Sequence, residues 1–143
     1  VRCADLKNVV AVKEASGDLV QISEIVRDAG DRMNMLSGED ALTLPMMALG
    51  ATGVISVVAN VVPADYAQMV RSPGSGDVAG ARVIHNKLLR LTRALFIESN
   101  PIPVKTGLSW MGRCQPDLRM PLTAIGEDAG KQLRLAMSEV GLL

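Results

Sequence analysis

The sequence predicts an α/β fold in which about three strand–helix units are followed by a purely helical region. Within the first sixty residues, short runs of small and β-branched residues alternate with segments whose apolar residues recur at helical spacing. Beyond Asp77 only the helical spacing remains. Strands that alternate with helices in this way form parallel sheets, because a parallel neighbour is reached through a crossover connection.

The first expected strand is the apolar run at 9–13, which ends in a charged residue, Lys13. Four consecutive small or β-branched residues indicate a buried parallel strand that is covered on both faces. Asp18 is expected to cap the helix that follows, because its carboxylate accepts hydrogen bonds from the free N–H groups of the first turn. Gly30 stands where the C-terminal cap of that helix is expected.

The next two units repeat this layout at shorter length. We expect strands and helices in turn at 33–37, 41–49, 54–58 and 63–70. Asp40 is the expected cap of the second helix, and Pro63 suits the first turn of the third, where its missing N–H has no partner to lose. The segment 71–76 is rich in Ser, Pro and Gly and is expected to form a loop.

The remainder of the chain is expected to be helical. A long apolar stripe at three- and four-residue spacing consists of Ala81, Ile84, Leu88, Leu91 and Leu95. Two more helices are expected at 104–111 and 129–140, and both X–Pro bonds at 100–103 are candidates for the cis form. We therefore divide the chain into residues 1–70, which carry the strand–helix units, and residues 71–143, which form a helical region.

Composition bounds the class of protein. The 143 residues suit one domain, and because 48% are hydrophobic but only 2% aromatic, the core must be aliphatic and methionine-rich. Fifteen basic residues balance fifteen acidic ones, which argues against nucleic acid or an anionic membrane as a partner. Cys3 and Cys114 form no metal or redox motif and are expected to be reduced thiols, with one disulfide as the alternative.

The ends and the hydropathy of the chain add two expectations. No apolar stretch approaches the ~20 residues of a membrane helix, and no signal peptide opens the chain. Because the first residue is not Met, we expect the chain to begin inside a longer protein.

Lys13 is the strongest candidate for chemistry. In α/β folds the carboxyl ends of parallel strands carry the reactive groups, because loops from several strands meet there. A lysine in a partly apolar pocket there can act as a free amine, which is a nucleophile for a carbonyl carbon. The alternative is that Lys13 marks the end of the strand and points into water, as most charged residues do.

Several segments, in this order, resemble the dihydrodipicolinate synthase family. They are the lysine segment at 9–18, Leu-Ser-Gly-Glu-Asp at 36–40, Gly-Ala-Thr-Gly-Val-Ile-Ser-Val at 50–57, Asn-Val-Val-Pro at 60–63, Glu-Ser-Asn-Pro-Ile-Pro-Val-Lys at 98–105 and Leu-Arg-Met-Pro-Leu at 118–122. The lysine and Gly-Val-Ile-Ser segments are shared with the wider superfamily of pyruvate-dependent aldolases. The two later segments resemble the synthase family more narrowly.

The resemblance implies a fold and a reaction. A closed (β/α)8 TIM barrel needs ~250 residues, so this chain would be the C-terminal part of one, with about three βα units and extra C-terminal helices. Lys13 would form a Schiff base with pyruvate, whose enamine attacks aspartate semialdehyde. Gly38 and Ile55 would contact the pyruvate moiety. Without the resemblance, Gly38 is equally a turn glycine and Ile55 a core residue.

The resemblance also implies an enzyme without metal or organic cofactor, cytoplasmic and homotetrameric. The alternatives are a sister enzyme, such as an N-acetylneuraminate lyase or a keto-deoxy sugar-acid aldolase, or an inactive fragment that needs an N-terminal half. The family's tyrosines, threonine and arginine that move protons and bind substrate lie upstream and have no matching position here. Tyr66, in a helix after the third strand, is no substitute.

Other polar residues are weaker candidates. Glu14, Glu39 and Asp40 could transfer protons, although Asp40 is more simply a cap and Glu39 an anion of the first helical turn. Ser37 and Ser56 have no histidine near them in sequence. The sole histidine, His85, falls within a helical pattern, which argues against a catalytic triad or a histidine metal site.

Overall fold

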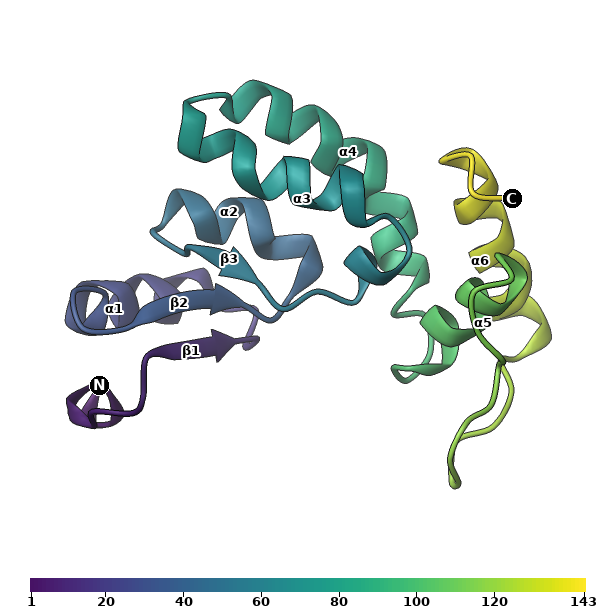
Figure 1. Cartoon of the computed structure of the whole chain (residues 1–143), viewed down its shortest axis with the longest axis horizontal. Coiled ribbons are helices and arrows are strands. Elements are labelled where there is room, and N and C mark those ends of the chain that lie inside the picture. The colour runs from purple at the N-terminus through teal and green to yellow at the C-terminus, as the bar shows by residue number, and fades with distance from the viewer. The chain divides into compact units, whose positions relative to one another are not determined.

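A computed structural model describes all 143 residues (Figure 1). Three parallel strands form one sheet in the order β1 (Ala11–Glu14), β2 (Asn34–Ser37) and β3 (Gly53–Val54). The crossover from β1 to β2 is α1 (Leu19–Ala29), and that from β2 to β3 comprises a 3₁₀ turn (Asp40–Leu42) and α2 (Thr43–Ala48). The expected strand–helix units and their parallel pairing are confirmed.

The remaining regular elements are all helical, as expected, and residues 111–126 between the last two helices form no helix or strand. The helices are α3 (Pro63–Arg71), α4 (Val78–Ala94), α5 (Ile102–Trp110) and α6 (Glu127–Glu139), with short 3₁₀ turns at Arg2–Asp5, Val58–Asn60 and Ser72–Ser75. The expected loop at 71–76 is thus mostly a 3₁₀ turn. The turn ends at Gly76, whose φ is 84°. Asn100–Pro101 is cis, and so is Met120–Pro121. No helix combines the length and the apolar character that a membrane crossing requires.

The chain forms two compact units. The first comprises Val1–Ser56 with Gln68–Arg82, and the second comprises Val57–Ala67 with Val83–Leu143. The division of the chain at residue 70 stays a prediction.

In the first unit, the core lies between the sheet and its two crossover helices. Its centre is a buried cluster of Ile22 from α1, Met35 from β2, Met46 from α2 and Ala51. Val12 of β1 packs against this cluster from the sheet side. Helices α1 and α2 therefore cover the face of the sheet that presents Val12 and Met35, and methionine supplies much of the filling, as the composition predicts.

Two strand predictions need correction. The first strand was expected to be buried on both faces, but β1 pairs with β2 alone and Val10, just before it, is 67% exposed. The third strand was expected to extend to Val58, but β3 has two residues and a 3₁₀ turn begins at Val58. Both strands lie at the edges of this sheet, and an edge strand has a ladder on one side only.

The helix caps divide into confirmed and wrong predictions. Asp18 caps α1 through its Oδ1, which accepts from Val20 N at 2.8 Å and Gln21 N at 3.2 Å. Gly30 ends α1 as expected, in right-handed conformation. Asp40 is not a cap. Glu39 caps the turn by accepting from Ala41 N at 3.4 Å, while Asp40 is buried and accepts a hydrogen bond from Ser56 Oγ.

The second unit is built on helix–helix packing. Leu88, Leu91 and Leu95, at the end of the expected stripe, are fully buried. Helices α5 and α6 pack closely against each other. An added Cβ atom at Gly107 of α5 would lie only 3.0 Å from Met137 Sδ of α6. Ion pairs Lys87–Asp65 and Arg90–Glu139 lie on the exposed surface. Such pairs contribute little, so burial of the aliphatic stripe must hold this unit together.

Replacing Asp18 with Ala should lower the free energy of unfolding by about 1 kcal/mol, because two N–H groups of α1 lose their acceptor. Asp18→Asn is the matched control and should lose much less, since its amide oxygen can still accept. Urea denaturation of the three proteins measures this. Equal losses for Ala and Asn would contradict the capping role.

Stability should also depend on the protonation of His85. Burial lowers the pKa of this imidazole below its ordinary value of 6.5, because the charged form loses hydration. Because its histidine keeps the ordinary pKa of 6.5, the unfolded chain takes up a proton at a higher pH than the folded chain does. Stability therefore falls as the pH falls from 6.5 through the lowered pKa of the folded state. Urea midpoints between pH 8 and pH 5 should decrease less in His85→Gln. An identical decrease in both proteins would refute this source of acid sensitivity.

Candidate active site

The strand register places the three predicted site residues on one face of the sheet. Lys13 is the ladder partner of Leu36, and Leu36 is the partner of Gly53. Because side chains alternate along a strand, Gly38 shares the face of Leu36, and Ile55 shares that of Gly53. Lys13, Gly38 and Ile55 therefore come from three successive strand ends and share one face at the carboxyl edge of the sheet.

Backbone hydrogen bonds hold these strand ends together beyond the strands themselves. Gly38 N donates to Glu14 O at 2.7 Å, and Ile55 N donates to Ser37 O at 2.8 Å. The ladder thus continues through both predicted binding positions. Their main chains are fixed by the same pairing that orders the strands.

Gly38 is the position over which the Lys13 side chain passes. A Cβ atom at Gly38 would lie 2.8 Å from Lys13 Cε, 3.0 Å from Lys13 Cγ and 2.8 Å from Ala15 Cβ. Gly38 is not among the glycines with positive φ, so no turn requires glycine here. The absence of a side chain serves the close approach of the lysine instead.

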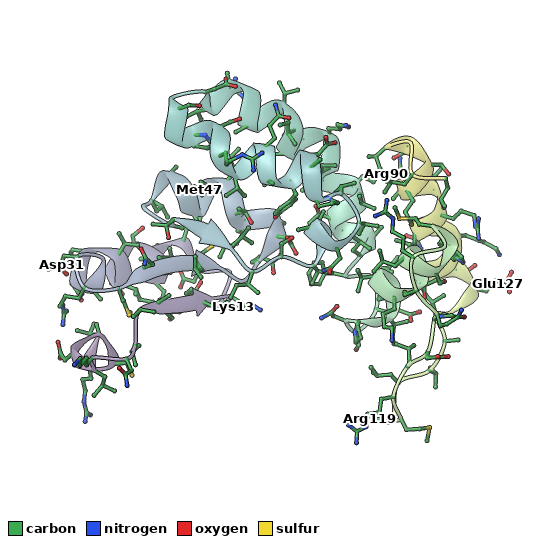
Figure 2. All side chains as sticks on the ribbon, in the orientation of Figure 1. Lys13, Asp31, Met47, Arg90, Arg119 and Glu127 are labelled. Atoms are coloured by element: carbon green, nitrogen blue, oxygen red, sulfur yellow. The ribbon has the colours of Figure 1, made fainter.

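The surroundings of Lys13 differ from the expectation of a partly apolar pocket. Lys13 is exposed at the end of β1, where Figure 2 shows its side chain beyond the tip of the arrow. Ile55, the expected pocket wall, is 51% exposed. The helices and the apolar core lie on the opposite face of the sheet, so neither residue is enclosed by the first unit.

The opposite face buries the acidic candidate next to the lysine. Glu14 is 6% exposed, and its Oε1 accepts from Ser16 N at 3.0 Å and from Gln21 Nε2 at 3.1 Å. Its burial was missed by sequence reasoning, which treated it as a possible proton carrier. The alternation of side chains along a strand could have predicted it. If Lys13 points away from the core, the adjacent Glu14 must point toward it.

The other polar candidates have structural contacts. Ser37 is fully buried and donates to Glu39 O at 2.8 Å. Ser56 Oγ donates to Asp40, which ties the end of β3 to the turn after β2. No three His, Cys, Asp or Glu side chains of residues 1–143 gather as a metal site would need. A reaction without metal stays a prediction.

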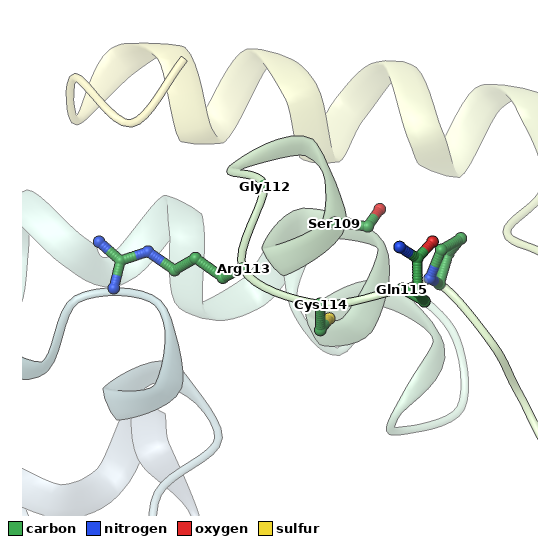
Figure 3. A pocket seen from close by; sticks show the side chains of 6 residues that line it. Ser109, Gly112, Arg113, Cys114 and Gln115 are labelled. Carbon is green, nitrogen blue, oxygen red and sulfur yellow. The ribbon is translucent and has the colours of Figure 1, made fainter.

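A cavity of about 560 Å³ lies in the second unit (Figure 3). It is lined by Ser109, Gly112, Arg113, Cys114, Gln115 and Pro116. None of these is a predicted site residue. The side chain of Arg113 points away from Cys114 and Gln115 in the close view.

Comparison with known proteins identifies the family of this chain. The model of the dihydrodipicolinate synthetase family matches residues 1–140. The 4-hydroxy-tetrahydrodipicolinate synthase of Geotalea uraniireducens is 47% identical over 142 residues, which are 99% of this chain and 49% of the relative. The chain thus spans about half the length of the curated relatives it matches.

Solved structures match as closely. The dihydrodipicolinate synthase of Aquifex aeolicus has a TM-score of 0.94 and 44% identity, over 98% of this chain and 48% of that one. The chloride-inhibited enzyme of Acinetobacter baumannii, complexed with pyruvate, has a TM-score of 0.94 and 35% identity over 99% and 49%. The predicted fold class is therefore confirmed: the chain is the C-terminal part of a (β/α)8 TIM barrel with added helices. It belongs to the dihydrodipicolinate synthetase family.

Proposed function

We propose that Lys13 is the imine-forming nucleophile of a 4-hydroxy-tetrahydrodipicolinate synthase, a lyase of lysine and diaminopimelate biosynthesis that condenses pyruvate with aspartate semialdehyde. The carrying observation is the register that sets Lys13 over Gly38 at the carboxyl edge of a parallel sheet. In barrels of this type that edge carries the chemistry. The names of the relatives support the choice of reaction.

The chemistry requires a neutral amine at Lys13. Its nitrogen adds to the keto carbon of pyruvate, and loss of water leaves a protonated imine. This cation draws electrons, so the neighbouring methyl group loses a proton and an enamine forms. The enamine carbon then bonds to the aldehyde carbon of the second substrate, whose oxygen takes a proton. Attack of water or an amine on the imine carbon finally releases the lysine. The lysine supplies the covalent chemistry, so no metal or organic cofactor takes part.

Gly38 and Ile55 are the proposed binding positions for pyruvate. Gly38 leaves the stem of Lys13 free to lie against the backbone, since a Cβ atom at Gly38 would lie 2.8 Å from Lys13 Cε. Ile55 offers an apolar side chain on the same face, suited to the methyl group of pyruvate. Both roles are supported by the ladder, which brings the two positions to the edge of the sheet where Lys13 lies.

The sister reactions share the imine step and differ in the aldehyde. An N-acetylneuraminate lyase or a keto-deoxy sugar-acid aldolase would use Lys13 identically, so the adduct alone does not distinguish them. The relatives named above favour the synthase. Consumption of aspartate semialdehyde, compared with N-acetylmannosamine and a short sugar aldehyde, separates the three.

The proposed enzyme is a cytoplasmic homotetramer. Both cysteines, Cys3 and Cys114, are free and exposed, which suits a reducing compartment. Because the chain spans about half the length of its relatives, the proposal includes a complementary N-terminal half that encloses the exposed face of Lys13. Sedimentation of residues 1–143, alone and with that half, tests both associations.

Incubation with pyruvate and borohydride should add one reduced pyruvyl group to Lys13, because borohydride traps the imine. Intact mass and a peptide digest measure the adduct. Lys13→Arg is the control and should gain nothing, since a guanidinium stays protonated. Equal labelling of Lys7, Lys87, Lys105 and Lys131 would contradict a specific site. No adduct on a folded chain, but one after the complementary half is added, would identify residues 1–143 as an inactive fragment.

Gly38→Ala should slow the formation of this adduct roughly 10- to 100-fold, because the new methyl group displaces the lysine stem from its present path. Gly74→Ala is the matched control, since nothing lies within 4 Å of a side chain there. Adduct rates of both variants, with urea denaturation to confirm folding, decide the matter. A normal rate in Gly38→Ala would show that the close approach has no part in the reaction.

A further inference from the structure

Glu14 holds a buried oxygen without a partner. The residue is 6% exposed, and its Oε1 accepts both of the hydrogen bonds that its carboxylate makes. Oε2 is buried with no hydrogen-bond partner. It is the only side-chain nitrogen or oxygen atom of the chain in this condition.

Stability alone does not explain a carboxylate at this position. A buried acceptor without a donor destabilises the folded state, more so when the group is charged. A methionine of similar length would fill the same space without that cost. Unsatisfied buried groups of this kind call for a reason other than packing.

The contacts of Glu14 converge on the segment that carries Lys13. Its Oε1 joins Ser16, two residues further along, to Gln21 in the first turn of α1. Its main-chain oxygen accepts from Gly38 N at 2.7 Å. Glu14 thus connects the end of β1, the start of α1 and the residue over which the Lys13 side chain passes.

We propose that Glu14 is a positioning residue, which clamps the turn after β1 so that the Lys13 amine stays directed over Gly38. This inference rests on the proposed role of Lys13. The carboxylate is suited to the clamp because hydrogen bonds from N–H groups to an ionised oxygen are stronger than those to a neutral one. The unpartnered Oε2 is the accompanying cost in stability.

Three substitutions test the clamp. Glu14→Met removes the acceptor, and Glu14→Gln keeps one neutral acceptor oxygen. Gln21→Met removes one of the two donors at an exposed position, where the substitution should not disturb folding. Gln68→Met is the matched control, being the same change at another exposed helical position of the first unit. The readouts are the rate of the pyruvate–borohydride adduct on Lys13, amide hydrogen exchange at Ser16 and Gly38, and the urea midpoint.

We expect Glu14→Met to be at least as stable as the parent chain but roughly tenfold slower in adduct formation. The loss should lie in the maximal rate and not in the pyruvate concentration at half-maximum. Glu14→Gln should recover most of the rate. Gln21→Met should lose less than Glu14→Met, and the double variant should be no slower than Glu14→Met, since both act on one clamp. Exchange at Ser16 should accelerate in each slow variant, and Gln68→Met should match the parent.

The two proposals fail in different ways. If the parent chain, with or without its complementary half, forms no adduct, the role of Lys13 fails, and exchange at Ser16 and Gly38 alone judges the clamp. Unchanged exchange in Glu14→Met would then overturn the clamp. If exchange accelerates while the adduct rate stays normal, the clamp exists but does not position the lysine, and the inference is overturned. Should Glu14→Met not fold, Gln21→Met decides by the same two readouts.

Discussion

The parallel pairing of β1 with β2 is the constraint on which the candidate site depends. It sets Lys13 opposite Leu36 and continues into the bond between Gly38 N and Glu14 O. That one bond joins Glu14, the last residue of β1, to Gly38, over which the Lys13 side chain passes. Side-chain alternation then assigns the two faces, with Glu14 toward the helices and Lys13 away from them.

The two faces of the sheet have opposite physical requirements. On the helix side, Met35 and its neighbours form an apolar core, and Glu14 is buried with its Oε1 satisfied by Ser16 and Gln21. On the lysine side, Gly38 leaves room and Ile55 remains half-exposed. A rigid layer beneath and an open layer above are what a reactive amine needs, since its backbone must be fixed while its nitrogen stays accessible to a ketone.

The spacing of apolar residues, together with capping and turn residues, predicted the strand–helix units, the cap at Asp18 and the helical tail. They failed where tertiary contacts decide. Asp40 looks like a cap by position, yet the neighbouring Glu39 takes that role and Asp40 turns inward to Ser56. The length of β3 was overestimated because Val57 and Val58 are apolar whether they form a strand or a buried turn. The exposure of Lys13 matches the alternative that the sequence left open, in which the lysine ends the strand and points into water. Local sequence could not decide between the two, because burial depends on what covers the face.

Adjacent placement of Lys13 and Glu14 on a four-residue strand has a consequence for how this protein can vary. A substitution at either position leaves the facing of the strand unchanged. A one-residue insertion or deletion within β1 is different, because it inverts the facing of the strand and would bring the ammonium group into the methionine core while turning the carboxylate outward. The length of this strand is therefore fixed, and surrounding loops must absorb every change in spacing.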